Sequence, residues 1–270
     1  MFDRTPLANA AQGGFHGVVN ILLGRQGVNP NKSDSFGRTP LSYAAARRGE
    51  GVVKTLLGRD DVTPDTAGYS GQTPLSYAAE WGNVEAVKML LGRKEVNPDS
   101  SDKDGRTPLS YAVAGGHEGV AKILLGREEV NPGKPDKNGR TPLLYAARGL
   151  DWLWRAADEG SEGVVQMLLG REEVRADRAD NSGRTPLSYA AGRGKVEVVK
   201  ILLGWKEVNP DKPDNKGRTP LSYAAAEGHG RVAKVLLERE EVKLDNPDHH
   251  GKTPRMFAAR LKSMAWMTLL

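Results

Sequence analysis

Three short motifs contain residue types that could do catalytic chemistry, and each lacks a residue that the chemistry needs. Gly251-Lys-Thr253 resembles the end of a phosphate-binding loop, but that loop needs a glycine five residues before Gly251, where Asn246 stands. His117-Glu118 is not followed by the second histidine that would place two metal ligands on one helical face. Gly68-Tyr-Ser-Gly71 lacks the second spacer residue of a nucleophile elbow. The sequence therefore favours a protein that is not an enzyme and has no catalytic residue.

The adjacent histidines His249 and His250 are the remaining candidates for chemistry, because imidazole nitrogens bind metal ions. The sequence places no cluster of carboxylates or thiols that would complete such a site, and the chain contains no cysteine. Adjacent histidines at the tip of a turn are more often solvated than metal-bound. We therefore expect neither a metal site nor a cofactor.

Two periodic series of arginines, with a formal net charge of +5, raise the alternative of nucleic-acid binding. The first series is Arg38, Arg106, Arg140, Arg184 and Arg218, and the second is Arg25, Arg59, Arg93, Arg127, Arg171 and Arg239. Each arginine of the first series follows an aspartate by four residues, and Gly68 and Gln72 replace both residues together in one copy. This covariation predicts an aspartate–arginine pair across a turn, which would leave little positive charge for phosphates. No nucleic acid is expected as a partner.

These motifs all lie within a stretch that recurs along the chain. A Thr-Pro pair marks each copy, and its threonines are Thr5, Thr39, Thr73, Thr107, Thr141, Thr185, Thr219 and Thr253. Six of the seven intervals are 34 residues, whereas the step from Thr141 to Thr185 is 44 and so contains ten extra residues. A fixed period of this size indicates a solenoid, in which each unit buries its apolar face against its neighbours.

The copy at residues 102–135 shows the elements that each unit must contain. Asp102-Lys-Asp-Gly105 has the composition of a tight turn, Thr107 suits a helix N-cap, and Pro108 suits the first helical position. Residues 108–114 are expected to form a short first helix, which Gly115-Gly116 ends. Apolar residues then return at helical spacing from Val120 to Leu125 as a second helix, which Gly126 ends, and a proline-containing extended segment leads into the next turn.

The run Asp-x-x-Gly-Arg-Thr-Pro-Leu-Ser-Tyr-Ala-Ala resembles the ankyrin repeat, and the resemblance covers essentially the whole chain. It departs from the usual pattern in having serine after Thr-Pro-Leu, where the family usually has histidine, and in its longer finger. Arrays of this kind resemble those attached to fungal NACHT-type nucleotide-binding receptors. The resemblance implies an all-α solenoid of about eight stacked helix-turn-helix units with short hairpin fingers.

We predict a single ankyrin-repeat domain over residues 1–270, because no linker interrupts the repeats. The predicted repeats are 1–33, 34–67, 68–101, 102–135, 136–179 with an insertion at 148–157, 180–213, 214–247 and 248–270. Neither a signal peptide nor an apolar run of about 18 residues is seen, so we expect a cytoplasmic or nuclear protein that does not enter a membrane.

Candidate binding residues lie where the copies differ most, because residues that pack one repeat on the next must stay nearly constant. The turn tips and the end of the first helix vary most, and the resemblance places both on the concave, partner-binding face of ankyrin proteins. The candidates at the tips are Phe36, Tyr69, Ser70, Lys103, Asp104, Lys137 and Asn138, and those at the helix ends are Arg47, Glu80, Trp81 and Arg193. Trp81, Tyr69 and Phe36 favour an interface, because large aromatic side chains are enriched at interface hot spots.

The ten-residue insertion supplies two further candidates, Trp152 and Trp154. Insertions in repeat proteins emerge on one face as binding loops, and a tryptophan pair would make a strong anchor. The alternative is that both indoles fold back over neighbouring helix ends. Taken together, the sequence predicts a scaffold that binds another protein and is monomeric unless its last repeat self-associates. The alternative function is an oligomerisation or regulatory module, such as a fragment of a NACHT-type receptor.

Overall fold

The computed structural model describes residues 3–47, 49–148 and 161–260. The chain forms two compact units, Met1–Lys137 and Asn138–Leu270, which we call unit 1 and unit 2. The single domain that the uninterrupted repeats suggest stays a prediction.

The described residues fold into helices joined by turns and extended segments, with no β-strand among them. Unit 1 contains α1 (Pro6–Gln12), α2 (His16–Leu23), α3 (Pro40–Ala45), α4 (Glu50–Leu57), α5 (Pro74–Glu80), α6 (Val84–Leu91), α7 (Pro108–Ala114) and α8 (Glu118–Leu125). Unit 2 contains α9 (Pro142–Arg148), α10 (Ser161–Leu169), α11 (Pro186–Gly192), α12 (Val196–Leu203), α13 (Pro220–Ala226), α14 (Gly230–Leu237) and α15 (Pro254–Arg260). The all-helical repeat fold expected from the sequence is thus confirmed. A count of eight repeats stays a prediction, because the second helix of the last one would fall in residues 261–270.

The first helix of each repeat begins where the Thr-Pro pair predicts. In α7 the hydroxyl oxygen of Thr107 accepts a hydrogen bond from the backbone N–H of Ser110 at 3.2 Å. Pro108 occupies the first helical position, where its missing N–H costs nothing. The same threonine cap is present at Thr5, Thr39, Thr73, Thr185 and Thr219. The repeated pair therefore fixes where each first helix starts.

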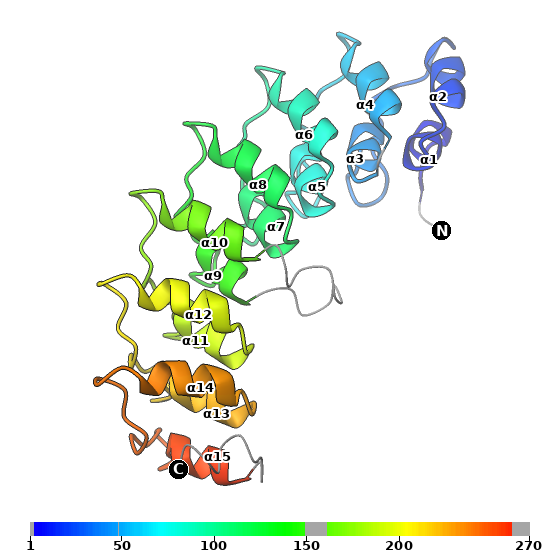
Figure 1. The fold of residues 1–270 in the computed structure, drawn as a ribbon. Helices are drawn as coiled ribbons and strands as arrows, with labels where there is room; N and C mark the ends of the chain where they lie inside the picture. The colour runs from blue at the N-terminus through cyan, green and yellow to red at the C-terminus, as the bar shows by residue number, and fades with distance from the viewer. Residues whose placement is uncertain (1–2, 48, 149–160, 261–270) are drawn as a thin grey trace. The chain divides into compact units, whose positions relative to one another are not determined.

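Within each unit the helices lie in two rows. First helices pack on first helices, as α1, α3, α5 and α7 do in unit 1, and second helices pack on second helices, as α2, α4, α6 and α8 do (Figure 1). The core between the rows is aliphatic and small, because leucine from the first helix meets valine, alanine and leucine from the second. Leu109 of α7 and Ala121 and Leu124 of α8 are completely buried.

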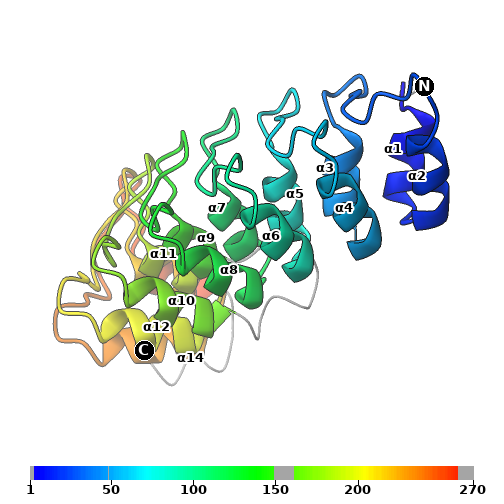
Figure 2. The same ribbon diagram turned by 90° about the horizontal axis from the view of Figure 1, so that it is seen from above.

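Each second helix leads through an extended segment and a tight turn into the next first helix. We call residues such as 102–106 the finger of a repeat, and the fingers of unit 1 project from the same side of its helices (Figure 2). The fingers are turns without strand pairing, so the predicted hairpin has no β-ladder among the described residues. None of the described helices is long and apolar enough to cross a membrane.

Candidate functional site

An aspartate and a tyrosine fix each finger to its first helix. In the second repeat, Oδ1 of Asp34 accepts backbone N–H bonds from Phe36 and Arg38, each at 2.9 Å. Its Oδ2 accepts the hydroxyl of Tyr43 at 2.6 Å. The same arrangement joins Asp102 to Tyr111, Asp180 to Tyr189 and Asp214 to Tyr223. Burial acts to raise the pKa of Asp34, but the bonds from Tyr43 and the backbone outweigh it and lower that pKa.

Adjacent fingers are joined by one backbone hydrogen bond each, and a glycine makes the approach possible. The N–H of Lys137 donates to the carbonyl of Asp104 at 2.8 Å. Gly105, next to that carbonyl, has a φ of +85°, and a Cβ there would lie 3.0 Å from the backbone nitrogen of Lys137. Only glycine accepts both the positive φ and the close contact. The fingers therefore present their tips at a fixed spacing.

The predicted residues at the finger tips are all exposed. Phe36 and Tyr69 are the large apolar ones, and Tyr69 is 66 % exposed. The N–H of Tyr69 donates to the carbonyl of Phe36 at 2.8 Å, so these two aromatic residues occupy successive fingers. The polar candidates of unit 1, Ser70, Lys103, Asp104 and Lys137, are exposed on the next tips, and Asn138 is exposed in unit 2.

Three of the predicted residues meet in one pocket of unit 1. Arg47, Glu80 and Trp81 line a cavity of about 310 Å³ together with the side chains of Tyr43 and Tyr77. The guanidinium of Arg47 lies 5.8 Å from the centroid of the Trp81 ring, which is a cation–π arrangement. Trp81 is nevertheless 51 % exposed. A large indole is thus presented to solvent at the edge of a pocket.

Glu80 gives this pocket a carboxyl group whose ionisation is hindered. Burial raises the pKa of Glu80, and a hydrogen bond from the amide of Gln72 at 3.2 Å partly opposes that effect. Arg38 lies on the finger side of the same pocket, with its guanidinium 4.7 Å from the Phe36 ring centroid and 4.9 Å from that of Tyr43. Arg38 therefore connects the aromatic finger tip to the pocket.

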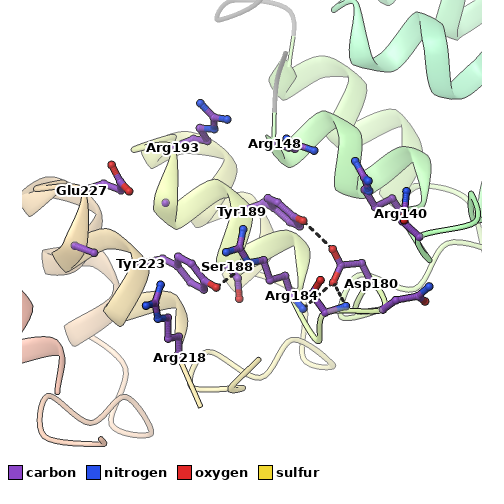
Figure 3. A pocket seen from close by; sticks show the side chains of 15 residues that line it. Arg140, Arg148, Asp180, Arg184, Ser188, Tyr189, Arg193, Arg218, Tyr223 and Glu227 are labelled. Atoms are coloured by element: carbon purple, nitrogen blue, oxygen red, sulfur yellow. Dashed lines mark hydrogen bonds between the residues drawn. The ribbon is translucent and has the colours of Figure 1, made fainter. Parts of the chain in front are cut away.

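Unit 2 has a second pocket at the equivalent positions of its own repeats, with a volume of about 480 Å³ (Figure 3). Of the predicted residues it contains Asn138 and Arg193. Its other charged lining residues are Arg140, Arg148, Asp180, Arg184, Arg218 and Glu227. Arg184 lies between Tyr189 and Tyr223, with its guanidinium 5.6 and 4.5 Å from their ring centroids. Burial raises the pKa of Tyr223 to about 12, and its hydrogen bond to Asp214 acts in the same direction.

Members of the first arginine series contact aspartates in three arrangements, and in one of them Arg106 contacts Asp104 of its own finger at 3.9 Å. In the second repeat, Arg38 contacts Asp34 of its own turn at 3.0 Å, as the sequence predicts. Arg184 and Arg218 instead contact the aspartate of the following repeat, Asp214 at 4.0 Å and Asp248 at 3.6 Å. Arg38 has no such partner, because the following repeat carries Gly68 at that position. The turn-spanning pair is therefore correct for Arg38 and wrong for Arg184 and Arg218.

Arginines of the second series donate hydrogen bonds to the C-terminal carbonyls of helices in the preceding repeat. Arg93 donates to the carbonyl of Leu57 at 3.0 Å, and Arg127 donates to that of Leu91 at 3.1 Å. These leucines end α4 and α6, where the last carbonyls lack partners within the helix. Other members pair with nearby acids as expected, Arg59 with Asp61 at 2.7 Å and Arg171 with Glu173 at 3.7 Å.

The histidines of the sequence motifs either join neighbouring repeats or lie on a finger tip. Nε2 of His117 donates to the carbonyl of Glu80 at 2.9 Å and so ties its repeat to the preceding first helix. Asn83 makes the same type of bond one repeat earlier, to the carbonyl of Ala45. His249 and His250 are exposed on a finger tip. Within residues 3–47, 49–148 and 161–260, no three metal-ligating side chains are grouped to hold an ion.

Constant residues of the site were missed by the sequence reasoning. Searching for variable positions omitted residues that are nearly constant in every copy, such as Arg184, Tyr189 and Tyr223, although they line the unit 2 pocket. The repeat period could have identified these constant residues, because it places each of them close to the variable end of a first helix. Trp152 and Trp154 lie outside the residues that the structure describes, so their role stays a prediction.

The sequence also matches a known protein family. A family model described as ankyrin repeats in three copies matches residues 7–102, 93–152, 153–248 and 206–270. These ranges cover nearly the whole chain. A comparison with curated proteins found no match.

Proposed function

The chain belongs to the ankyrin-repeat family, and from that premise we propose that it is a non-catalytic scaffold that binds a protein partner. Ankyrin repeats are generally protein–protein interaction modules, and the family is typically non-catalytic. We assign the partner to the face formed by the finger tips and the ends of the first helices, which we call the first-helix face. The predicted cytoplasmic or nuclear location is part of this proposal.

The exposed indole of Trp81 is the observation that carries the proposal. Its helix-end position is occupied by Arg47 in the preceding repeat and by Gly115 in the following one, so packing between repeats does not require an aromatic side chain there. Tryptophan is enriched among residues that dominate binding energy, especially beside a pocket that excludes water. The stacked Arg47 reduces the conformational freedom of the indole, which lowers the entropy lost on binding.

The neighbouring finger tips extend the same surface. Phe36 and Tyr69 add exposed rings on successive fingers, and Arg38 joins them to the pocket. An interface with aromatic anchors surrounded by polar residues such as Ser70 and Glu80 has the composition of a binding site between proteins. These residues are therefore proposed as the centre of the interface in unit 1.

The test is capture of a partner by immobilised chain, followed by quantitation of one identified protein on matched variants. The double variant Trp81→Ala, Tyr69→Ala should bind that protein at least about 10-fold less than the unchanged chain. Trp205→Ala is the matched control, because Trp205 is a 40 % exposed indole just after α12 that does not line the unit 2 pocket. If all three chains captured the partner equally, or if only Trp205→Ala lost binding, the partner would not bind through the first-helix face.

One observation favours a second candidate function, self-association. Val18 on α2 is 47 % exposed, whereas the residues at its position in the repeats that the structure describes up to Val232, including Val52 and Val120, are at most 1 % exposed. Ile21, one helical turn later, is exposed as well. Sedimentation of the purified chain distinguishes the candidates: a dimer that Val18→Glu converts to monomer supports self-association, and a monomer at all concentrations excludes it.

A further inference from the structure

The third repeat lacks the aspartate that accepts hydrogen bonds at the base of other fingers. Gly68 stands at the position that other repeats fill with Asp34, Asp102, Asp180 and Asp214. Each of those carboxylates accepts hydrogen bonds from two backbone N–H groups and a tyrosine hydroxyl. Figure 3 shows this arrangement for Asp180 and Tyr189. The third repeat keeps its tyrosine, Tyr77, but not the carboxylate that would accept its proton.

The other donors to that carboxylate are also present in the third repeat. Its turn closes as the other turns do, because the N–H of Gly68 donates to the carbonyl of Gln72 at 2.9 Å. The N–H of Gln72 donates to the hydroxyl of Ser70, at the long distance of 3.4 Å. The hydroxyl of Tyr77 interacts with the same serine side chain. A neutral hydroxyl thus stands where the other repeats have an ionised acceptor, which makes stronger hydrogen bonds.

Arg38 of the preceding repeat is affected by the same substitution. The corresponding Arg184 donates from Nε to the Tyr223 hydroxyl at 2.7 Å, and its guanidinium lies 4.0 Å from Asp214. Arg38 instead directs Nε and Nη2 to Asp34, at 3.1 and 3.0 Å. None of the hydrogen bonds described for Arg38 uses Nη1. This nitrogen can therefore donate to a further acceptor.

The pocket that contains Arg47 and Trp81, which we call the unit 1 pocket, gives access to these donors. Arg38 and Tyr77 both line it. Its volume of about 310 Å³ has room for an acidic side chain. The described contact of the Arg47 guanidinium is with the ring of Trp81, so its N–H groups can also face an acceptor that enters the pocket.

Glu80, the carboxyl group that lines this pocket, does not replace the aspartate. Its Oε2 accepts the side-chain amide of Gln72 at 3.2 Å, and no described hydrogen bond joins it to Tyr77. Its charge and that of Asp34 balance the two lining arginines. The position of the hydrogen-bond donors, rather than a net charge, therefore determines what the pocket can bind.

We propose that the unit 1 pocket binds an aspartate or glutamate side chain of the protein partner, whose carboxylate occupies the position of the aspartate that Gly68 replaces. This inference rests on the proposed function and adds the chemistry of the partner segment. The hydroxyl of Tyr77 and Nη1 of Arg38 are the donors, just as the corresponding tyrosine and arginine of unit 2 surround Asp214. An apolar residue beside the acid would pack on Trp81, which lines the same pocket.

The experiment measures fluorescence anisotropy of a labelled peptide of repeated Gly-Ser-Glu-Leu units with the full chain at low salt. The same peptide with glutamine in place of glutamate should bind at least about 10-fold more weakly, because a charged acceptor makes the stronger hydrogen bond. Tyr77→Phe removes a donor and should weaken binding of the glutamate peptide by at least about 10-fold. Tyr111→Phe is the matched control, because its hydroxyl already donates to Asp102, and it should leave the affinity per folded molecule unchanged.

Gly68→Asp tests the same site by supplying the carboxylate from the chain itself. Gly68 lies outside the left-handed region, and a Cβ there would lie 3.2 Å from the carbonyl oxygen of Phe36, a contact that requires only a small shift. Other repeats carry an aspartate at this position. The variant should raise the melting temperature and lower the affinity for the glutamate peptide by at least about 10-fold, so that unfolding does not explain the loss.

The inference would be overturned by equal or unmeasurable binding of the two peptides, by unchanged affinity in Tyr77→Phe or Gly68→Asp, or by an equal loss in Tyr111→Phe. Tighter binding of a phosphoserine peptide that depends on Tyr77 would also overturn it. The proposed function fails separately. Capture that depends on Trp81 without a preference for glutamate would leave the scaffold function standing and remove this inference. A glutamate preference that depends on Tyr77, with capture indifferent to Trp81, would do the reverse.

Discussion

Replacing Leu124 by alanine tests whether neighbouring repeats hold one another in place. Leu124 is completely buried on α8, which packs against α6 and α7. Removing three buried carbons costs about 0.8 kcal/mol each, or about 2 kcal/mol in total, and the cavity that remains adds to this. We expect a total cost of about 2–5 kcal/mol. Because each repeat is stabilised only by its neighbours, the loss should also uncouple the two sides of the array.

The assay is urea denaturation followed by circular dichroism, with two matched variants. Leu22 holds the same position in the first repeat but is only partly buried, so Leu22→Ala should cost less than Leu124→Ala. Lys122→Ala changes an exposed residue of the same helix and should stay within about 0.5 kcal/mol of the unchanged chain. A Leu124→Ala curve that keeps the single transition and midpoint of the unchanged chain would refute the nearest-neighbour account.

Four further predictions follow from the described contacts and the sequence. Gly105→Ala should destabilise the chain more than Gly126→Ala, because only Gly105 combines a positive φ with a close backbone contact; equal melting temperatures would contradict this. Burial lowers the pKa of His117, so the contribution of this residue to the free energy of unfolding should be complete above about pH 6.5 and decline below it. The variant His117→Asn introduces the amide that Asn83 carries at the same repeat position, and it should remove that part of the pH dependence in thermal melts. DNA binding in gel shifts should be weak and lost at modest salt, and salt-resistant binding would contradict the arginine pairing. Deleting residues 148–157 should keep the fold but weaken partner capture, and a collapsed thermal transition with unchanged capture per folded molecule would make the insertion structural.

The local structure was predictable because each element is set by short-range chemistry. The Thr-Pro pair alone locates the start of every first helix, since capping and the proline position depend only on adjacent residues. The turn glycines were predictable for the same reason, as a positive φ is a property of one residue. The repeat fold was predictable in turn, because the Thr-Pro pair and the turn glycines recur at a fixed period along the chain.

Which aspartate each arginine of the first series contacts was not predictable from spacing. Arg218 could reach an aspartate four residues back or one in the next repeat, and spacing alone does not distinguish the two. Only the packing of adjacent fingers shows that Asp248 is the nearer carboxylate, at 3.6 Å. His117 was missed in the same way, because its acceptor, the carbonyl of Glu80, belongs to the preceding repeat and carries no sequence signal.

The candidate site was only half predictable, because the criterion selected variable residues. Trp81 and Arg47 were found, and they do line a common pocket. Tyr189 and Arg184 were not, because residues that support the face are nearly constant while they also line its pocket. Variation within one chain thus finds the residues that can differ but not the constant residues that position them.

Site-specific photo-crosslinking tests the first-helix face most directly. A photoreactive phenylalanine derivative would replace Trp81, or Lys88 as the control, since Lys88 is an exposed residue on the second helix of the same repeat. The account predicts that the captured partner crosslinks from position 81 and not from position 88. Crosslinking from position 88 without crosslinking from position 81 would contradict it.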